Sequence, residues 1–273
     1  MRLLLLCVAL LSCTAARPAR DARVVDFFVD PVGKVYYLRG DSYLTTANPL
    51  GGNDYVFFDS SLGRPDLVDV TNPFAILVHY AEYGQVVILD RTLSELGRRD
   101  LLAVEGLLQP GAVAKGNPGG IWIFDSWDYR LKLLADNGSI THRSNDLRLE
   151  LGLFTEPDHI YVDRDNVYLH YVDQRLLAAF SNYGRYGQTI SLPAGDRFGW
   201  YAPYLTGRGE DQDWFYHTGH PTPQSWARPR VQGEEHPPTP QGGEAKGGKS
   251  KILRGKDRTY ELNGAGVMVE RGL

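Results

Sequence analysis

Short apolar segments recur along the chain at a nearly constant interval, from about residue 24 to residue 192. In one series a turn residue opens an aromatic-rich or aliphatic run, and these turn residues are Gly33, Pro73, Gly120 and Asn166. The successive intervals are 40, 47 and 46 residues. In a second series an apolar run ends at Asp90, Asp136 or Ser181, at intervals of 46 and 45 residues. Two series that share one period indicate an internal structural repeat.

Each repeat reads as three or four short β-strands. A third apolar run precedes the other two in units around residues 67–70, 112–114 and 160–163, and no stretch shows sustained helical periodicity. Asn137-Gly138 supplies the positive-φ residues that a tight hairpin needs. One small antiparallel sheet cannot bury both faces alone, but several packed radially can. The period therefore predicts an all-β propeller of about five, and up to six, four-stranded blades. A β-sandwich with evenly spaced turns is the alternative.

The segments Val68–Pro73 and Gln85–Asp90 carry a family resemblance. They resemble NHL/PQQ-type β-propeller repeats, in which a Gly-initiated inner strand is followed by an apolar strand and Asp-x-x-Gly. The chain is also similar to uncharacterised propeller-like lipoproteins of Gram-negative envelopes. The resemblance covers residues 24–192 and implies the fold, but it carries over no catalytic residue.

The chain divides into five stretches by composition. Pro, Gly, Gln, Glu and Lys dominate residues 207–256, which predicts a disordered insertion because such a tract buries too little apolar surface to offset its ordering entropy. The other predicted stretches are a signal peptide (1–12), a tether (13–23), propeller blades (24–206) and a terminal strand hairpin that closes the propeller (257–273).

The N-terminus has the pattern of an export signal. Arg2 precedes the apolar run Leu3–Leu11, which is too short to span a bilayer but has the length of a signal-peptide core. The following Leu10-Leu11-Ser12-Cys13 resembles the lipobox of bacterial lipoproteins, which implies lipidation of Cys13. The only other cysteine is Cys7, inside the same signal. An ordinary signal cleaved near Ala15–Ala16 or Ala19 is the alternative.

Lipidation would tether the protein to a membrane through its lipid anchor. No Asp, the usual inner-membrane retention signal, follows Cys13, which favours the periplasmic side of the outer membrane over the inner membrane. A soluble periplasmic or secreted protein is the alternative. An unidentified envelope protein is the predicted partner. The net charge of −4 gives no basic face for nucleic acid, so no nucleic-acid partner is expected.

Three motifs in the sequence resemble ligand-binding sites. Gly243–Ser250 matches the P-loop pattern, but a Pro/Gly-rich tract precedes it where a strand is needed, so we expect no nucleotide and no cofactor. His217 and His220 near the acidic residues 210–213, and the segment Asp163–Asn166, are interpreted as loops and a turn, with no metal site. No recognisable catalytic motif occurs, so no catalytic residue is assigned and the chain is predicted not to be an enzyme.

Aromatic residues cluster after the fourth repeat, in what reads as loops. They are the predicted binding surface, because exposed aromatic side chains are typical of contacts: Tyr183, Tyr186, Trp200, Tyr201 and Tyr204. The alternative is that Phe198, Trp200 and Tyr201 form the inner strand of a fifth blade. The sequence thus predicts a protein-interaction scaffold. A carbohydrate or small-ligand binder, or a metal-dependent lactonase, hydrolase or lyase, is the alternative.

Overall fold

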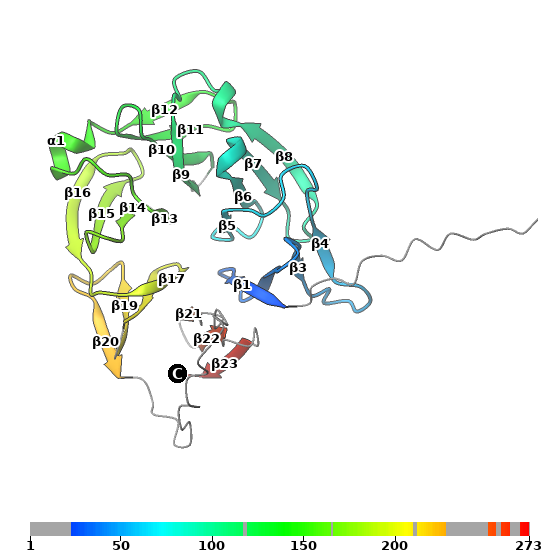
Figure 1. Cartoon of the computed structure of the whole chain (residues 1–273). Helices are drawn as coiled ribbons and strands as arrows, with labels where there is room; N and C mark the ends of the chain where they lie inside the picture. Colours follow the sequence, from blue (N-terminus) through cyan, green and yellow to red (C-terminus); the bar gives the residue numbers. More distant parts are fainter. Residues whose placement is uncertain are drawn as a thin grey trace, which may run out of the picture.

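The computed structural model describes residues 23–116, 119–164, 166–209, 212–227, 251–254, 258–262 and 268–272. Their strands form six antiparallel sheets, five of four strands and one of three. The sheets are arranged as blades around a central axis (Figure 1). The chain is therefore a β-propeller, as the repeat predicts.

In every sheet the strands follow one another in chain order, so each blade is an up-and-down meander. The first blade contains β1 (Val24–Val29), β2 (Val35–Arg39), β3 (Leu44–Thr46) and β4 (Tyr55–Phe57). The second contains β5 (Leu67–Asp69), β6 (Ile76–Tyr80), β7 (Gln85–Leu89) and β8 (Glu95–Asp100). The third contains β9 (Pro110–Lys115), β10 (Ile121–Asp125), β11 (Arg130–Leu134) and β12 (Ile140–Arg143).

The remaining blades follow the same order. The fourth contains β13 (His159–Asp163), β14 (Asn166–Tyr171), β15 (Leu176–Ser181) and β16 (Tyr186–Ser191). The fifth contains β17 (Asp196–Tyr201), β18 (Tyr204–Arg208), β19 (Gln212–His217) and β20 (Gln224–Ala227), and the sixth contains β21 (Lys251–Arg254), β22 (Arg258–Leu262) and β23 (Met268–Gly272). The helical segments are α1 (Leu147–Leu151) and two 3₁₀ turns, η1 (Ala81–Tyr83) and η2 (Leu101–Ala103). Within the part described, no helix has the length and apolar character needed to cross a membrane.

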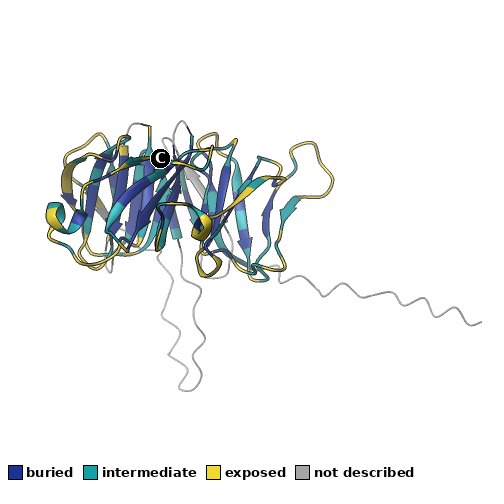
Figure 2. Ribbon diagram, turned by 90° about the horizontal axis from the view of Figure 1, so that it is seen from above, coloured by how far each residue is buried: buried dark blue, intermediate teal, exposed yellow. Residues whose placement is uncertain are grey.

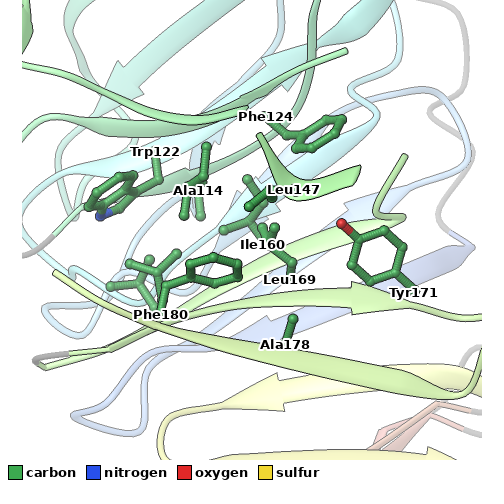
Figure 3. Packing of buried hydrophobic residues seen from close by; sticks show 12 residues of the cluster. Ala114, Trp122, Phe124, Leu147, Ile160, Leu169, Tyr171, Ala178 and Phe180 are labelled. Carbon is green, nitrogen blue, oxygen red and sulfur yellow. The ribbon is translucent and has the colours of Figure 1, made fainter. Parts of the chain in front are cut away.

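Burial follows from the position of a strand within its blade. The second strands β6 and β10 are buried along their whole length, since neighbouring blades cover both of their faces, whereas the fourth strand β8 is mostly exposed. Figure 2 shows the buried strands as a slab with exposed loops on either side. Figure 3 shows the largest core cluster, in which Trp122 and Phe124 of the third blade pack with Leu169 and Phe180 of the fourth. The core thus lies between blades.

The structure corrects one sequence-based strand assignment. Trp200 and Tyr201 were expected in a loop, but they lie in β17, the first strand of a fifth blade. The alternative assignment of these aromatic residues is therefore the correct one.

The boundaries of the predicted insertion at residues 207–256 also need correction. Residues 212–217 and 224–227 are strands β19 and β20, which complete the fifth blade, and residues 251–254 are strand β21. Residues 228–250 lie outside the described residues. The predicted terminal hairpin corresponds to β22 and β23, which pair with each other; β22 also pairs with β21, so the three strands form a separate sixth sheet.

The sixth sheet contacts both of its neighbours. A Cβ on Gly199 of β17 would lie 2.3 Å from the Ile252 carbonyl oxygen, so glycine is needed for this close approach. The Thr206 hydroxyl donates to the same oxygen at 2.6 Å. On the other side, Leu253 packs in one cluster with Phe27 and Val29 of β1. This sheet thus joins the fifth blade to the first.

Candidate functional site

A cavity of about 200 Å³ lies in the central channel. Apart from Leu38 of β2, the residues that line it come from the first strand, or the segment beside it, of five blades: β1, β5, β13, β17 and β21. Because these innermost strands have no further strand on their channel side, their side chains there contact the cavity. Its apolar wall includes Phe28, Leu67, Tyr161, Phe198, Trp200 and Leu253.

Trp200 is the centre of the aromatic wall. Its ring stacks on the Tyr161 ring with centroids 5.0 Å apart and planes 19° apart. Its indole nitrogen is buried, yet it has no hydrogen-bond acceptor among the residues that the structure describes. An unsatisfied buried donor costs free energy, so this N–H group favours a ligand that carries an acceptor.

Two histidines lie beside this wall. The His159 ring, which lines the cavity, lies 5.9 Å from the rings of Tyr161 and His170. Burial lowers the pKa of His159; the Asp158 carboxylate opposes this effect and the Lys251 ammonium adds to it. Burial, with a contribution from His159, lowers the pKa of His170 to about 3. Both imidazoles are therefore neutral at physiological pH.

A lysine–aspartate pair contributes charge to the wall, which also contains Arg64, Asp66 and Asp69. Lys251 Nζ donates to Asp26 Oδ1 at 2.9 Å and to the Phe27 carbonyl at 3.1 Å. It also lies 4.4 Å from the centroid of the Phe28 ring. An ammonium group has three donors, so one N–H remains for an acceptor in the cavity.

Other carboxylates near the channel have structural partners. Asp66 accepts a hydrogen bond from the backbone N–H of Ala81, and Asp158 accepts one from that of Val172, each at 2.7 Å. Both follow a proline just before the first strand of a blade, at Pro65 and Pro157. These hydrogen bonds hold the first strand of the blade to the end of the second.

The structure separates the five aromatic residues predicted to form one binding surface. Trp200 and Tyr201 line the channel cavity, whereas Tyr183 and Tyr186 line a different cleft on the fourth blade. The Tyr204 ring packs against His217, with centroids 4.9 Å apart. They therefore do not form one continuous surface, and binding by any of them stays a prediction. The predicted lipidation residue Cys13 lies outside the described residues.

Sequence reasoning missed Phe28, His159, Tyr161 and Lys251 as cavity residues. Tyr161 belongs to the run at residues 160–163 that precedes the other two runs of its repeat, and His159 comes directly before it, so their position was available from the register. The position of Lys251 could not be predicted from the register, because residue 251 falls within the predicted insertion at residues 207–256. The repeated Pro-Asp before β5 and β13, and the His-Tyr pairs at 79–80 and 170–171, were further signals of equivalent positions.

The two motifs that resemble metal sites lie at strand ends: His217 ends β19 and Asp163 ends β13. The His217 ring lies 5.0 Å from the His220 ring, and Asp163 Oδ2 accepts a hydrogen bond from Thr218 at 2.7 Å. Residues 210, 211 and 165, which belong to these motifs, lie outside the described part. Among the residues that are described, no group of three His, Cys, Asp or Glu side chains could hold a metal ion.

Solved structures similar to this chain are β-propellers. A streptogramin B lyase is 13% identical with a TM-score of 0.57, and the alignment covers 94% of this chain and 85% of that one. A catalytically inactive virginiamycin B lyase from Staphylococcus aureus with quinupristin is 12% identical, with a TM-score of 0.56 over 94% and 86%. A nidogen/laminin complex gives 14% identity and a TM-score of 0.52 over 75% and 80%. The sequence itself matches no protein-family model and no curated protein.

These comparisons correct the prediction that the chain is not an enzyme. Three lyase structures match it over 93–94% of its length. The absence of a recognisable catalytic motif in the sequence was therefore no argument against activity, because enzymes share this fold. At 12–14% identity the likeness shows the fold alone and assigns no reaction to this chain.

Proposed function

We propose that this protein binds a small ligand in the channel cavity. The ligand is largely apolar, contains a ring, and carries an anionic or hydrogen-bond acceptor group. The observation that carries the proposal is the combination in one cavity of an aromatic wall, a buried indole N–H without an acceptor, and a partly used ammonium group. Ligand pockets combine mostly apolar walls with a few polar groups that fix orientation in this way.

The dye 1-anilinonaphthalene-8-sulfonate is a suitable probe, because it has an apolar ring system and one anionic group. We expect its fluorescence to rise on binding, and its Kd to increase about tenfold or more in Trp200→Ala and in Lys251→Gln. Trp127→Ala is the matched control, since Trp127 is 66% exposed and does not line the cavity. Equal affinities in the wild type and Trp200→Ala would refute the channel site.

The same cavity supports a second candidate function, elimination chemistry. His159 is neutral and borders the cavity, so its imidazole can accept a proton from a substrate carbon while a neighbouring bond to a leaving group breaks. The similarity to lyases, one of them described as inactivated by a histidine-to-alanine change, supports testing this reaction.

Quinupristin, the compound named with that lyase, is an available first substrate. Under the elimination hypothesis, the protein consumes it and His159→Gln abolishes turnover while the dye still binds. Binding of the dye without turnover of quinupristin would leave the ligand-binding proposal in place and remove quinupristin as a substrate.

We further propose that the protein is exported and anchored through Cys13, on the periplasmic side of the outer membrane. The support is the short apolar run before this cysteine and the position of both cysteines in or beside that run. Cys13→Ala should move the protein from the membrane fraction to the soluble fraction, or stop its processing. A mature N-terminus downstream of residue 13 in mass spectra would contradict the anchor.

An envelope protein remains a candidate partner of the anchored propeller. Leu108 and Trp127 are more than 60% exposed, and their backbone N–H groups both bind the Asp125 carboxylate, so the two residues lie close together. Exposed apolar side chains of this kind are typical of protein contacts. Crosslinking at these residues tests the partner independently of the dye experiment.

A further inference from the structure

A second cleft lies between the third and fourth blades and shares no residue with the channel cavity. It has a volume of about 720 Å³. One side is formed by the end of β12 and by α1, and the other by the turn between β15 and β16. Among the residues that line the cleft are His142, Asn145, Glu150, Tyr183 and Arg185.

Gly184 fixes the position of the β15–β16 turn. Its φ is +74°, and a Cβ there would lie 3.4 Å from the backbone nitrogen of Ser144. A side chain at this position would be strained by the positive φ, although its Cβ would meet the third blade at an ordinary contact distance. The glycine lets the turn rest directly on the neighbouring blade, with Tyr183 and Arg185 on either side of it.

Tyr183 provides an open aromatic surface in the cleft. Its ring contacts the His142 ring, with centroids 5.4 Å apart and planes 61° apart. The residue is nevertheless 61% exposed. Contact with His142 orients the ring while most of it stays available to a ligand.

Polar groups with unused hydrogen-bonding capacity lie in the same cleft. Asn145 Nδ2 donates to Glu150 Oε1 at 2.7 Å, whereas Glu150 Oε2 is buried and has no donor among the described residues. Arg185 forms no ion pair within the part of the chain that the structure describes. A buried carboxylate oxygen without a donor is unfavourable, so the cleft favours a ligand that supplies one.

We propose that this cleft binds a neutral saccharide, with one sugar ring against Tyr183 and its hydroxyl groups on Glu150, Asn145 and Arg185. A sugar ring has an apolar face of C–H groups that packs on an aromatic ring. Its neighbouring hydroxyl groups donate to a carboxylate and accept from an amide or a guanidinium. An apolar ligand would leave Glu150 Oε2 without a donor, and an anionic one would meet the Glu150 carboxylate. The site is independent of the channel and of its proposed ligand.

Calorimetric titration with four hexasaccharides tests the proposal: cellohexaose, maltohexaose, xylohexaose and N-acetylchitohexaose. We expect at least one to bind with a Kd of about 1 mM or tighter. Tyr183→Ala and Glu150→Gln should each weaken that binding about tenfold or more, with Arg185→Ala as a third variant on a more exposed side chain. Phe154→Ala is the matched control, since this residue is 75% exposed and lies outside the cleft.

Thermal melts of each variant verify that it is folded before titration. Failure of all four sugars to bind the wild type would overturn the proposal. Binding that survives in Tyr183→Ala and Glu150→Gln would also overturn it, because the sugar would then lie elsewhere. Binding of the dye in the channel is unaffected in either case.

Discussion

The interior of the third blade and the wall of the channel each contain a tryptophan and a lysine–aspartate pair. In the blade, Trp122 is 1% exposed, and the side chains of Lys132 and Asp125 are 3% and 0% exposed at a separation of 2.7 Å. In the channel, Trp200 is only half-buried, and the side chains of Lys251 and Asp26 are 16% and 32% exposed at 2.9 Å. The same residue types thus occur in a closed setting, the fully buried interior of the blade, and in an open setting, the partly exposed wall of the channel.

The two settings differ in how fully the polar groups are paired. Asp125 accepts hydrogen bonds from Lys132 and from the backbone N–H groups of Leu108 and Gln109, and Lys132 also reaches the Gly106 carbonyl and Asp128. Burial alone would raise the pKa of Asp125, but these hydrogen bonds outweigh it and hold the pKa below its usual range. In the channel, one N–H of Lys251 and that of Trp200 lack an acceptor among the described residues. Saturated pairing indicates a structural role, whereas unsaturated pairing beside a cavity indicates a binding role.

The largest expected effect comes from truncating the tryptophan of the closed setting. Trp122→Ala should lower the free energy of unfolding by about 3–5 kcal/mol, because it removes a fully buried side chain and leaves a void between two blades. Trp200→Ala should cost only about 1–2 kcal/mol, because Trp200 is half-buried beside an existing cavity. Urea denaturation of both variants gives the two values. Equal losses would show that the channel wall is as much a part of the core as the blade interior.

Breaking the buried ion pair should have the next largest effect. Lys132→Met keeps most of the apolar stem but leaves Asp125 buried without its cation, so we expect a loss of about 3 kcal/mol. Arg148→Met is the control, because its partner Asp146 is at the surface of the short helix α1 and exposed pairs contribute little. Urea denaturation at neutral pH measures both. A loss below that of the control would mean that water reaches Asp125.

The buried histidines predict a loss of stability at acidic pH. Burial lowers the pKa of His79 to about 4, and burial with His159 lowers that of His170 to about 3, both from an unfolded value of 6.5. Between pH 6.5 and the folded-state pKa values, the unfolded chain binds more protons than the folded one. The contribution of each neutral histidine to the free energy of unfolding is therefore fully present above pH 6.5 and decreases as the pH falls. From pH 7 to pH 5 we expect a loss of roughly 1–2 kcal/mol for each histidine.

Urea denaturation of the wild type and of His170→Gln at several pH values measures this loss. The variant should show a smaller decrease between pH 7 and pH 5, whatever its stability at pH 7. Parallel curves for the wild type and His170→Gln would contradict the buried neutral imidazole.

The sequence predicts the blades better than it predicts the site. The repeat identified β6, β10 and β14 because they are buried along almost their whole length and form continuous apolar runs, whereas β2 is buried at alternate residues. It could not identify the sixth blade, since β21 is only four residues long and follows a long Pro/Gly-rich tract. Lys251 and Asp26 are 225 residues apart, and only ring closure brings them together. Trp200 follows Gly199, and glycine near aromatic residues reads as a loop, although here it permits contact with β21.

The smallest expected effect on stability comes from the ion pair of the open setting. Lys251→Gln and Asp26→Asn should each lower the free energy of unfolding by less than about 1 kcal/mol, because both side chains are partly solvated. A double-mutant cycle should give a coupling of about 0.5 kcal/mol between them.

The same Lys251→Gln change should weaken dye binding about tenfold, because the ligand loses its cation. Lys34→Gln is the matched control: Lys34 also lies over aromatic rings, at 5.6 Å from Tyr36 and 5.1 Å from Tyr55, but it does not line the cavity. A coupling as large as the loss in Lys132→Met would make Lys251 a structural residue that closes the ring, and the distinction between the two settings would no longer hold.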